Sequence, residues 1–410
     1  MRATALLRSP KIWVFTVYGV VIAVVLTMGY LGGVLDTDTP AQRVPIAWVD
    51  ADTGVGAQRD GAQLDEQVFS GSAQHTARWI RADTEAAARE LLARNEAYAA
   101  VVIPPEFTAR VTALTTPGAN AAPVPVTVLS NPLAGPAASG TAVGVAAAVL
   151  SRLSQQLGAG LTPAGLASAP GLLSDPVKVV VTPATSVPTH SAGGMAAFYY
   201  ALVLILTGFL LAQLLHSGVD GALGFAPREF LHRRSTRAPL PIDRVHTLLV
   251  KIGVLAGCAV IAATVIEALA VLGLGMPAAH PLGLWLFSVL AVFTAGVVPL
   301  ALLAVIGAPG ALVATVVLVV FGVPSSGGAY PPELQPAVFR WLGDVLPMRH
   351  ITDAARDLIF PTSSFHLTGA VVAVSLWLVF SLAFGLGATA FYDRTGRGRV
   401  SAHERSWQPA

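Results

Sequence analysis

The chain has 410 residues, of which 54% are hydrophobic and 12% are charged, and its net charge is +2. A soluble domain carries about 25% charged residues, so this composition excludes an ordinary soluble globular protein and indicates one that spans a lipid bilayer, and we expect no nucleic-acid partner. The chain has one cysteine, Cys258, so an intrachain disulfide is excluded. Cys258 lies in an apolar run, and we do not expect redox chemistry.

Six stretches of the sequence are long and apolar enough to cross a bilayer, which takes about 20 residues of helix. They are residues 12–35, 194–215, 252–274, 284–306, 308–323 and 367–391. The first run is longer than the core of a secretory signal, and no small-x-small cleavage site follows it. We therefore expect it to remain as an uncleaved signal anchor.

The distribution of charge indicates the direction in which these spans cross. With the N-terminus in the cytoplasm, the inside segments hold 13 basic and 5 acidic residues, and the outside segments hold 12 basic and 17 acidic residues. Arginine outnumbers lysine 22 to 3, which is typical of a GC-rich bacterial genome. We expect a multi-pass protein of the bacterial cell (plasma) membrane with both termini in the cytoplasm.

The spans divide the chain into four parts. They are an N-terminal cytoplasmic segment with the first transmembrane helix (1–35), an extracytoplasmic domain (36–193), a five-helix transmembrane domain (194–391) and a cytoplasmic tail (392–410). The five-helix domain contains a cytoplasmic loop (217–251) and an outside re-entrant or helical segment (324–366).

The extracytoplasmic domain alternates apolar, strand-like runs with helix-forming runs. Strands are expected at 43–50, 75–82, 98–103, 124–132 and 177–183, and helices at 83–97, 105–114 and 137–157. Asp83 or Thr84 is a natural N-cap for the first of these helices. Such alternation predicts a mixed sheet. The predicted fold class is an α-helical integral membrane protein of six transmembrane helices (one + five), with a mixed α/β extracytoplasmic domain inserted after the first helix.

The sequence contains no motif for catalysis, a cofactor or a metal: no phosphate loop, no His-Glu-x-x-His and no Gly-x-Ser-x-Gly. The aspartates that suggest a calcium loop are Asp36, Asp38, Asp50 and Asp52. An EF-hand count from Asp50 ends at Gly61 and not at the glutamate that such loops use, so solvated turn carboxylates are the favoured interpretation. We predict no catalytic, cofactor-binding or metal-binding residues, and any work must be powered by a partner protein or an ion gradient.

Glu267 is the one formal charge deep inside a predicted span, and Lys251 lies at the cytoplasmic end of the same helix. Burying an ionised carboxylate in lipid costs roughly several kcal/mol, so such a residue normally faces a bundle interior or a wet cavity. Glu267 is therefore a candidate for the substrate path or for a proton contact. The simpler alternative is a protonated or hydrogen-bonded carboxyl group at a helix interface, or one close enough to the outer surface to reach water.

The loop at 226–251 interleaves basic and apolar residues. Its candidate ATPase-coupling residues are Arg228, Phe230, Arg233, Arg234, Arg237 and Arg244. One interpretation is an orientation signal that also contacts anionic headgroups. The other is a short interfacial helix that docks onto a cytoplasmic protein.

The outside segment at 324–366 begins with a Gly- and Pro-rich stretch, "VPSSGGAYPPELQP". Irregular backbone at membrane depth is tolerated only where protein or water covers it. We expect a tight turn followed by one or two short helices that Pro331, Pro332 and Pro336 start or bound. Its rigidity suits a lid or an exit rim. The candidate gate residues are Gly327, Gly328, Tyr330, Pro331, Pro347 and Arg356.

Three stretches carry a resemblance to a known family. "PIAWVDADTGV" (45–55) is similar to the strand and acidic turn after that family's first span. "YAAVVIPPEFTARV" (98–111) is similar to its strand, proline, acidic residue and phenylalanine. The stretch 325–359, with Ser-Gly-Gly, Tyr-Pro, Leu-Pro and an arginine-bearing helix, is similar to its final outside segment. With the one-plus-five layout, the chain resembles the permeases of type-2 ABC exporters, and more closely the Pip/YhgE-like (phage-infection-protein-like) membrane proteins.

The resemblance implies a permease that forms a homodimer in the lipid bilayer and moves a lipid-like, amphipathic, drug or peptide substrate outward. A separate cytoplasmic ATPase subunit would supply the energy by gripping the N-terminal segment and the 217–250 loop. One feature departs from this pattern. The segment before the first span has only eleven residues, short for the interfacial helix of many such permeases.

Two further classes of function are open. Pip-like proteins and a similar accessory protein of type VII secretion share this layout without an obvious dedicated ATPase. A protein of that kind would be a membrane scaffold, a secretion accessory or a phage-receptor-like protein whose outside domain is a docking surface. An ATPase that adjoins in the genome or co-purifies distinguishes a permease from a scaffold. A membrane-bound enzyme is the least favoured class.

Overall fold

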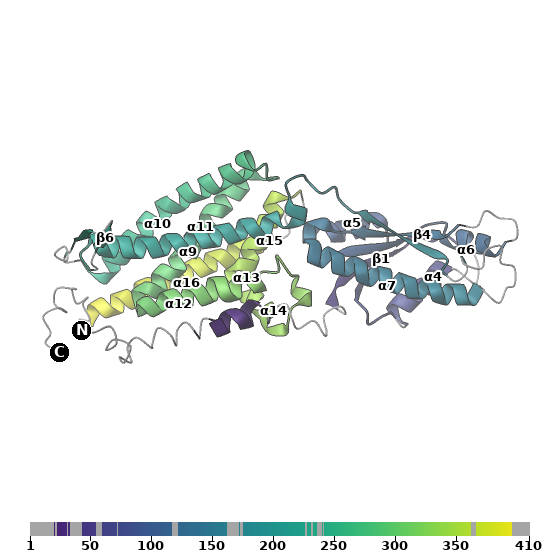
Figure 1. Ribbon diagram of the computed structural model, residues 1–410, viewed down its shortest axis with the longest axis horizontal. Coiled ribbons are helices and arrows are strands. Elements are labelled where there is room, and N and C mark those ends of the chain that lie inside the picture. Colours follow the sequence, from purple (N-terminus) through teal and green to yellow (C-terminus); the bar gives the residue numbers. More distant parts are fainter. Residues whose placement is uncertain are drawn as a thin grey trace.

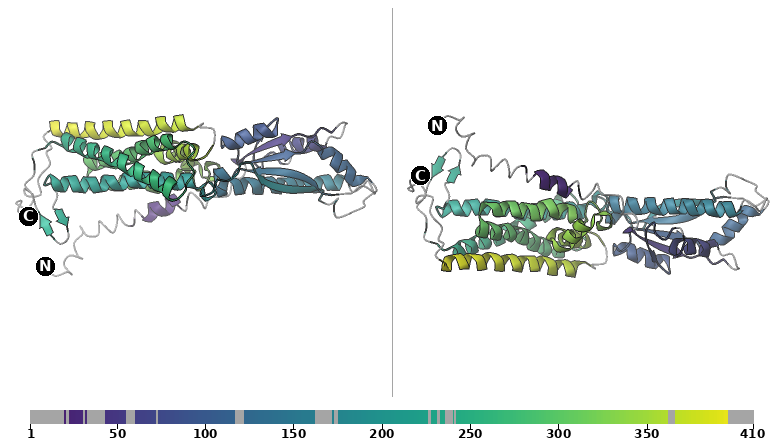
Figure 2. Two further views of the ribbon diagram at one scale, coloured as in Figure 1. Left: turned by 90° about the horizontal axis from the view of Figure 1, so that it is seen from above. Right: turned by 90° about the horizontal axis from the view of Figure 1, so that it is seen from below.

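The computed structural model describes residues 20, 23–30, 32, 43–54, 60–71, 73–116, 122–161, 172, 175–225, 228–230, 233–235, 240, 242–361 and 366–395. The molecule is elongated, with an α/β unit at one end and a helical bundle at the other (Figure 1). Two further views show the same end-to-end arrangement along the long axis (Figure 2). The two units therefore meet only across a narrow seam.

A five-stranded mixed sheet forms the centre of the α/β unit. Its strands are β1 (Pro45–Asp50), β2 (Arg78–Arg81), β3 (Ala99–Ile103), β4 (Val124–Ser130) and β5 (Val177–Pro183). The strand order is β2-β1-β3-β4-β5, and within it only the β3–β4 pair is antiparallel. Each strand lies within a stretch that the sequence predicted, so these strand positions are confirmed.

Helices cover both faces of the sheet. They are α4 (Asp60–Phe69), α5 (Glu85–Ala93), α6 (Phe107–Thr115) and α7 (Pro136–Leu161). Helices α4, α6 and α7 share a core with one face, and α5 packs on the other. Because β3 is covered on both sides, all five of its residues are buried, which explains its unbroken apolar sequence. The Thr84 side chain accepts a hydrogen bond from Ala87 N and caps α5, as predicted.

Helix α11 (Pro281–Ile306) is the central helix of the bundle. Around it lie α9 (Ala196–Ala222), α10 (Arg244–Glu267), α12 (Ala308–Thr315), α13 (Gly322–Ser325) and α16 (Leu367–Arg394). In its most apolar window α11 is 61% buried, against 22–39% for the windows of the other long bundle helices. Those outer helices expose large apolar side chains such as Leu210, Leu272 and Phe380, as contact with lipid chains requires.

Six helices among the described residues are long and apolar enough to cross a membrane. Five of them correspond to the predicted spans from residue 194 onward, so the chain is a multi-pass membrane protein. The sixth is α7, which the sequence did not mark as a span and which packs on the sheet. The predicted first span, 12–35, falls largely outside the described residues. Within it the structure describes residues 20, 23–30 and 32, which are helical.

Two bundle helices contain π-helical turns. One, η5 (Ala268–Gly273), continues α10, and the other, η6 (Val316–Phe321), joins α12 to α13. The fifth span therefore runs to Ser325 and is longer than the predicted 308–323. A Cβ atom built on Gly29 would lie 2.7 Å from the Val320 carbonyl oxygen. The described helical residues of the predicted first span thus contact the π-turn η6, the kind of irregular turn that is frequent at functional sites.

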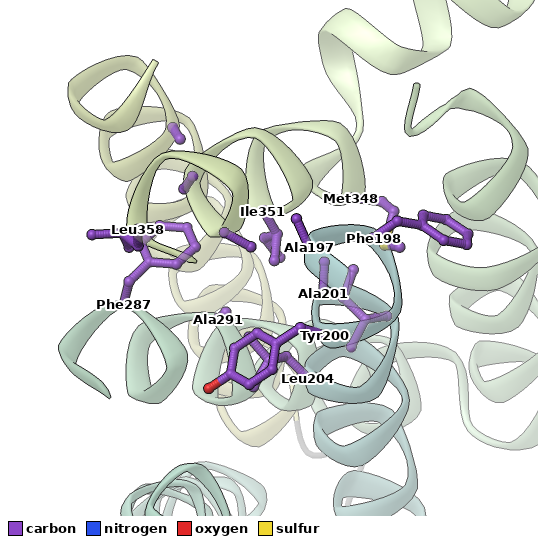
Figure 3. Packing of buried hydrophobic residues seen from close by; sticks show 14 of the residues in the cluster. Ala197, Phe198, Tyr200, Ala201, Leu204, Phe287, Ala291, Met348, Ile351 and Leu358 are labelled. Carbon is purple, nitrogen blue, oxygen red and sulfur yellow. The ribbon is translucent and has the colours of Figure 1, made fainter. Parts of the chain in front are cut away.

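Two short helices lie where the bundle meets the α/β unit. They are α14 (Ala337–Val345) and α15 (Pro347–Ile359), which confirms the expected short helices in the 324–366 segment. Helix α15 buries its apolar face on the bundle. Its Met348, Ile351 and Leu358 lie against side chains of α9 and α11 that include Tyr200 and Phe287 (Figure 3).

The loop between α9 and α10 corrects one prediction. Strands β6 (Arg228–Phe230) and β7 (Arg233–Ser235) pair as an antiparallel ladder. Among the described residues between these two helices none is helical, so the predicted interfacial helix is wrong for this part of the loop. Prolines at positions 227, 239 and 241 oppose a continuous helix because each lacks an N–H and clashes with the preceding turn.

Candidate functional site

Residues 326–336, which we call the connector, join α13 to α14 across the seam. Gly327 has φ +73°, in the left-handed region that glycine adopts without strain. A Cβ atom on Gly328 would lie 2.3 Å from a ring carbon of Phe198 on α9. Each position therefore requires glycine for a physical reason. Gly327 permits the turn, and Gly328 permits close contact with the bundle.

Side-chain hydrogen bonds to the backbone stabilise the compact conformation of the connector. The Gln335 side chain is buried and donates from Nε2 to the carbonyl oxygens of Pro324 at 2.9 Å and Tyr330 at 2.7 Å. The Ser326 hydroxyl oxygen accepts from Gly328 N at 3.2 Å. These contacts make a compact turn that replaces helical hydrogen bonds with side-chain ones.

The connector also enters the core of the α/β unit. Leu334 is buried in that core, and Tyr330 packs against it. The Tyr98 hydroxyl donates to Glu333 Oε2 at 2.7 Å. Burial and the neighbouring Glu333 carboxylate raise the pKa of Tyr98 well above its usual value, so its hydroxyl keeps the proton that it donates. The connector thus packs on the bundle with one side and on the sheet unit with the other.

Helix α15 presents a charged face to the seam. The helix begins at Pro347, whose fixed φ and missing N–H suit the first helical position. Arg349 Nη1 pairs with Asp344 Oδ1 at 2.6 Å, and its Nε lies 3.9 Å from Asp353 Oδ2. Arg356 Nη1 lies 3.3 Å from Asp353 Oδ1. The charged groups of α15 are therefore held in fixed positions by one another and by Asp344 of α14.

His366 ties the end of α15 to the start of α16. Asp357, which is buried, accepts a hydrogen bond from His366 N at 2.8 Å, and its other oxygen lies 3.7 Å from His366 Nδ1. The pKa of His366 is raised by its contact with Asp357, against an opposing effect of burial. Asp353 raises this pKa further, and Arg356 lowers it.

A cavity of about 170 Å³, which we call the seam cavity, lies where the α/β unit, the connector, α15 and the start of α16 meet. Its ionisable lining residues are Tyr98, Glu333, Arg349, Asp353, Arg356 and His366. Of the six candidate gate residues, Gly327, Pro331 and Arg356 line it. Gly328 and Tyr330 pack the connector against the two units, and Pro347 starts α15. The structure thus gathers these six residues at one place.

Glu267 lies elsewhere, at the end of α10 where the π-turn η5 begins. The Glu267 side chain is half-buried, and its Oε2 atom is buried without a hydrogen-bond partner among the described residues. Nearby, the Thr264 hydroxyl oxygen accepts from Trp285 Nε1 at 2.9 Å and joins α10 to α11. The position agrees with either interpretation of Glu267 that the sequence left open.

The coupling-loop residues lie at the end of the bundle farthest from the α/β unit, where β6 is seen in Figure 1. Arg228 and Phe230 are in β6, and Arg233 and Arg234 are in β7. Arg237 lies outside the described residues. The structure therefore brings four of these six residues into one two-stranded ladder.

Arg244, the last of the coupling-loop residues, starts α10, and its guanidinium lies over the Tyr392 ring of α16, 5.4 Å from the ring centroid. The Asp393 carboxylate accepts from Arg244 N at 3.2 Å and Val245 N at 3.1 Å. A carboxylate at a helix N-terminus stabilises the exposed N–H groups. This end of α10 is thus fixed to α16.

An ion pair deeper in the same end joins α9 to α10. Lys251 is 2% exposed, and its Nζ atom lies 2.7 Å from Asp220 Oδ1 and 3.1 Å from His216 Nδ1. Removal of one partner from a buried pair costs about 3–5 kcal/mol because the other charge is left without compensation. The loop therefore leaves the bundle from a rigid base.

The aspartates after β1 cap local backbone. Asp52 accepts from Thr108 Oγ1 at 2.5 Å, Thr108 N at 3.2 Å, Gly54 N at 3.3 Å and Gly61 N at 3.2 Å. Burial raises its pKa, but these hydrogen bonds outweigh burial and leave it below the ordinary value. Asp52 is buried, so the prediction of a solvated carboxylate is wrong for this residue. Among the described residues no group of three His, Cys, Asp or Glu could hold a metal ion.

Sequence reasoning did not single out Asn95, Tyr98, Glu333, Arg349 or His366, all of which line the seam cavity. The Tyr98–Glu333 contact joins positions 235 residues apart, and no local pattern encodes such a pair. One usable signal was present in the sequence. Glu333 is the only acidic residue of the connector, and a charge in a tight apolar turn calls for a partner.

Comparison with known proteins places the chain in a family. A search of curated proteins and a search of solved structures each returned no match. The family model described as ABC-2 family transporter protein matches residues 10–392, nearly the whole chain. This range takes in the helical bundle, the α/β unit and the seam between them. The chain is therefore a multi-pass membrane protein that belongs to the ABC-2 transporter family.

Proposed function

We propose that this chain is the membrane-spanning permease subunit of an ABC exporter, a non-catalytic subunit that moves a lipid-like, amphipathic, drug or peptide substrate outward. A separate cytoplasmic ATPase powers it, and two copies of the chain form the permease. The family match over residues 10–392 carries this proposal, because the family is that of ABC transporter membrane components. The Pip/YhgE-like subtype is part of the same proposal and rests on the sequence resemblance.

The proposed topology has six transmembrane helices with both termini in the cytoplasm. Residues 36–193 lie outside the cell, and the 217–251 loop lies inside. The charge asymmetry supports this direction, since the inside segments hold 13 basic and 5 acidic residues. In this proposed topology the seam lies at the outer surface and β6–β7 lies at the cytoplasmic surface.

The connector is the proposed outside gate. Its Gly328 packs against Phe198 of α9, and its Leu334 packs in the core of the α/β unit. Because the same short segment contacts both cores, a shift of α9 or α15 displaces the α/β unit as well. The gate therefore acts together with the outside unit and is not an independent lid.

The β6–β7 ladder is the proposed docking element for the ATPase. It projects from the end of the bundle opposite to the seam (Figure 1). The Lys251–Asp220 pair and the Asp393 cap on α10 make its base rigid. Force applied to the ladder is therefore passed to α9 and α10.

The experiment is co-purification in mild detergent followed by an ATPase assay. We expect an ATPase subunit to co-purify with the wild-type chain. The double variant Arg233→Glu, Arg234→Glu reverses charge on β7 and is expected to lose the ATPase or its substrate-stimulated activity. The double variant Arg89→Glu, Arg94→Glu changes α5 and its C-cap residue in the α/β unit and is the matched control. Unchanged activity in the β7 variant would contradict coupling through this ladder.

Glu267 has a separate test. Glu267→Gln keeps the shape of the side chain and removes its charge. If Glu267 belongs to the substrate path, transport by this variant falls while ATPase co-purification is retained. Transport at the wild-type rate would leave Glu267 as a buried carboxyl group with a structural role.

A membrane scaffold is the second candidate function. The α/β unit supports it, because this unit extends away from the bundle along the long axis and meets the bundle at one end (Figure 2). A scaffold would co-purify with proteins that bind the α/β unit and with no ATPase. The same purification therefore distinguishes the two functions.

A further inference from the structure

Arg356 leaves one hydrogen-bond donor without an acceptor at the seam. Its side chain is 8% exposed, and its Nη1 atom pairs with Asp353. Its Nε–H finds no acceptor among the described residues. A buried guanidinium donor without an acceptor is unfavourable, so an acceptor that reaches Nε would bind there with a gain in free energy.

This side chain lies between two hollows. It lines the seam cavity of about 170 Å³ and a smaller pocket of about 20 Å³ that Asn131 and Thr185 also line. The seam cavity has the volume of about five or six water molecules in the liquid. It therefore has room for a small organic ion.

The lining of the seam cavity carries both signs of charge. Arg349 and Arg356 supply two cations, and Glu333 and Asp353 supply two anions. A purely anionic or purely cationic ligand would leave one pair facing a like charge. A ligand with an anionic group and an ammonium group matches both pairs.

Hydrogen bonds fix the carboxylates of this cavity. Glu333 Oε2 accepts a hydrogen bond from the Tyr98 hydroxyl at 2.7 Å, so the α/β unit orients this carboxylate. Asp353 is held between Arg349 and Arg356 on α15. Preformed, oriented groups lower the entropic cost of binding.

The position of the cavity suggests the ligand's origin. His366 lines the cavity and directly precedes α16, one of the helices long and apolar enough to cross a membrane. The cavity therefore lies where a spanning helix leaves the hydrocarbon, at the depth of lipid headgroups. Arginine is the side chain best suited to phosphate because its donors form a planar fork.

We propose that the seam cavity binds a phosphoethanolamine group, with the phosphate at Arg356 and Arg349 and the ammonium at Glu333 and Asp353. This group is the headgroup of phosphatidylethanolamine, and it also exists as a free solute. Bound there, it joins the α/β unit to the bundle. The site does not depend on the proposed transport, since a scaffold would bind the same group.

The test uses the purified full-length protein. Titration calorimetry in detergent measures binding of free O-phosphoethanolamine, and native mass spectrometry of protein from mixed vesicles measures retained phosphatidylethanolamine against phosphatidylglycerol. Arg356→Gln, Arg349→Gln and Glu333→Gln are each expected to weaken binding at least about tenfold, the loss of one charge-assisted hydrogen bond. Arg89→Gln, on α5 and outside the cavity, is the control and is expected to bind as the wild type does.

The outcomes separate the possibilities. Binding of the free solute with loss in the cavity variants supports the site and an open access path. Retention of the lipid alone, with the same loss, supports the site with a lipid source. Thermal unfolding is recorded for every variant. If Arg356→Gln fails to fold, the binding results for Arg349→Gln and Glu333→Gln test the proposal. The proposal is overturned if the wild type binds neither probe, if all folded cavity variants bind as the wild type does, or if inorganic phosphate and phosphatidylglycerol bind equally well.

Discussion

His366 lies at the boundary between α15 and α16, and its charge state acts on the contact between them. Its backbone N–H donates to Asp357, and its ring lies close to the same carboxylate. Asp353 and Arg356 also act on the ring, with opposite signs, and Arg349 and Glu333 line the same cavity. The net effect is a pKa above the ordinary value of 6.5.

A raised folded-state pKa means that protonated His366 stabilises the fold. This stabilisation is fully present below the unfolded pKa of 6.5 and is lost as the pH rises through the folded pKa. We expect the melting temperature of the wild type to exceed that of His366→Gln at about pH 5.5, and the difference to shrink by about pH 8.5. His75→Gln changes an exposed histidine of the α/β unit and is the control. A difference that stays constant with pH would contradict the assignment.

At the scale of helices, α9 and α11 meet through glycine. A Cβ atom on Gly208 would lie 2.4 Å from the Val292 carbonyl oxygen, and one on Gly296 of α11 would lie 3.1 Å from the Gly208 carbonyl oxygen. Small residues permit this close approach, which drives helix association in lipid. The α9–α11 contact therefore depends on the absence of a side chain.

Gly208→Ala and Gly218→Ala are expected to have different effects on stability, although both residues lie on α9. The first forces α9 and α11 apart and should destabilise the protein by about 1–3 kcal/mol, as overpacking does. The second meets nothing within 4 Å, so the better helix propensity of alanine should leave stability unchanged or raise it by up to about 1 kcal/mol. Thermal unfolding in detergent measures both. Equal effects of the two substitutions would show that α9 does not pack on α11 as described.

Local sequence patterns predict the elements well where one physical signal dominates. Five apolar runs predict the spans from 194 onward, and five β-branched or alanine-rich runs predict the strands. Helix α4 was missed because its sequence, "DGAQLDEQVF", begins with Asp-Gly and has only three buried residues. The π-turns η5 and η6 were missed because they use the same apolar residues as an α-helix.

The candidate site was predicted only in part. The glycines and prolines of the connector mark a turn by their backbone chemistry, so that segment was found. The cavity depends instead on Tyr98, on α15 and on His366, which come together only in the folded chain. In the 226–251 loop a local pattern was present but led to the wrong element. Its interleaved basic and apolar residues suggested a helix, whereas residues 228–230 and 233–235 form the β6–β7 ladder.

At the scale of the whole molecule, the proposed orientation assigns opposite ends to opposite sides of the membrane. In a Cys258→Ala background, Thr182→Cys places a thiol on exposed β5, and Ser217→Cys places one on the exposed far end of α9. A membrane-impermeant maleimide on intact cells is expected to label the first and to label the second only after permeabilisation. The reverse pattern would overturn the orientation.

Helix α7 has a consequence for how the protein is made. It has 26 residues and the length and apolar character of a membrane span, yet it lies on the sheet. Strands β1 to β4 are all synthesised before it, and only the edge strand β5 follows. A nascent α7 therefore emerges when four strands of its docking face already exist. The chain order thus favours folding of α7 onto the sheet over its entry into the bilayer. Entry of α7 into the bilayer would invert the direction of every later span.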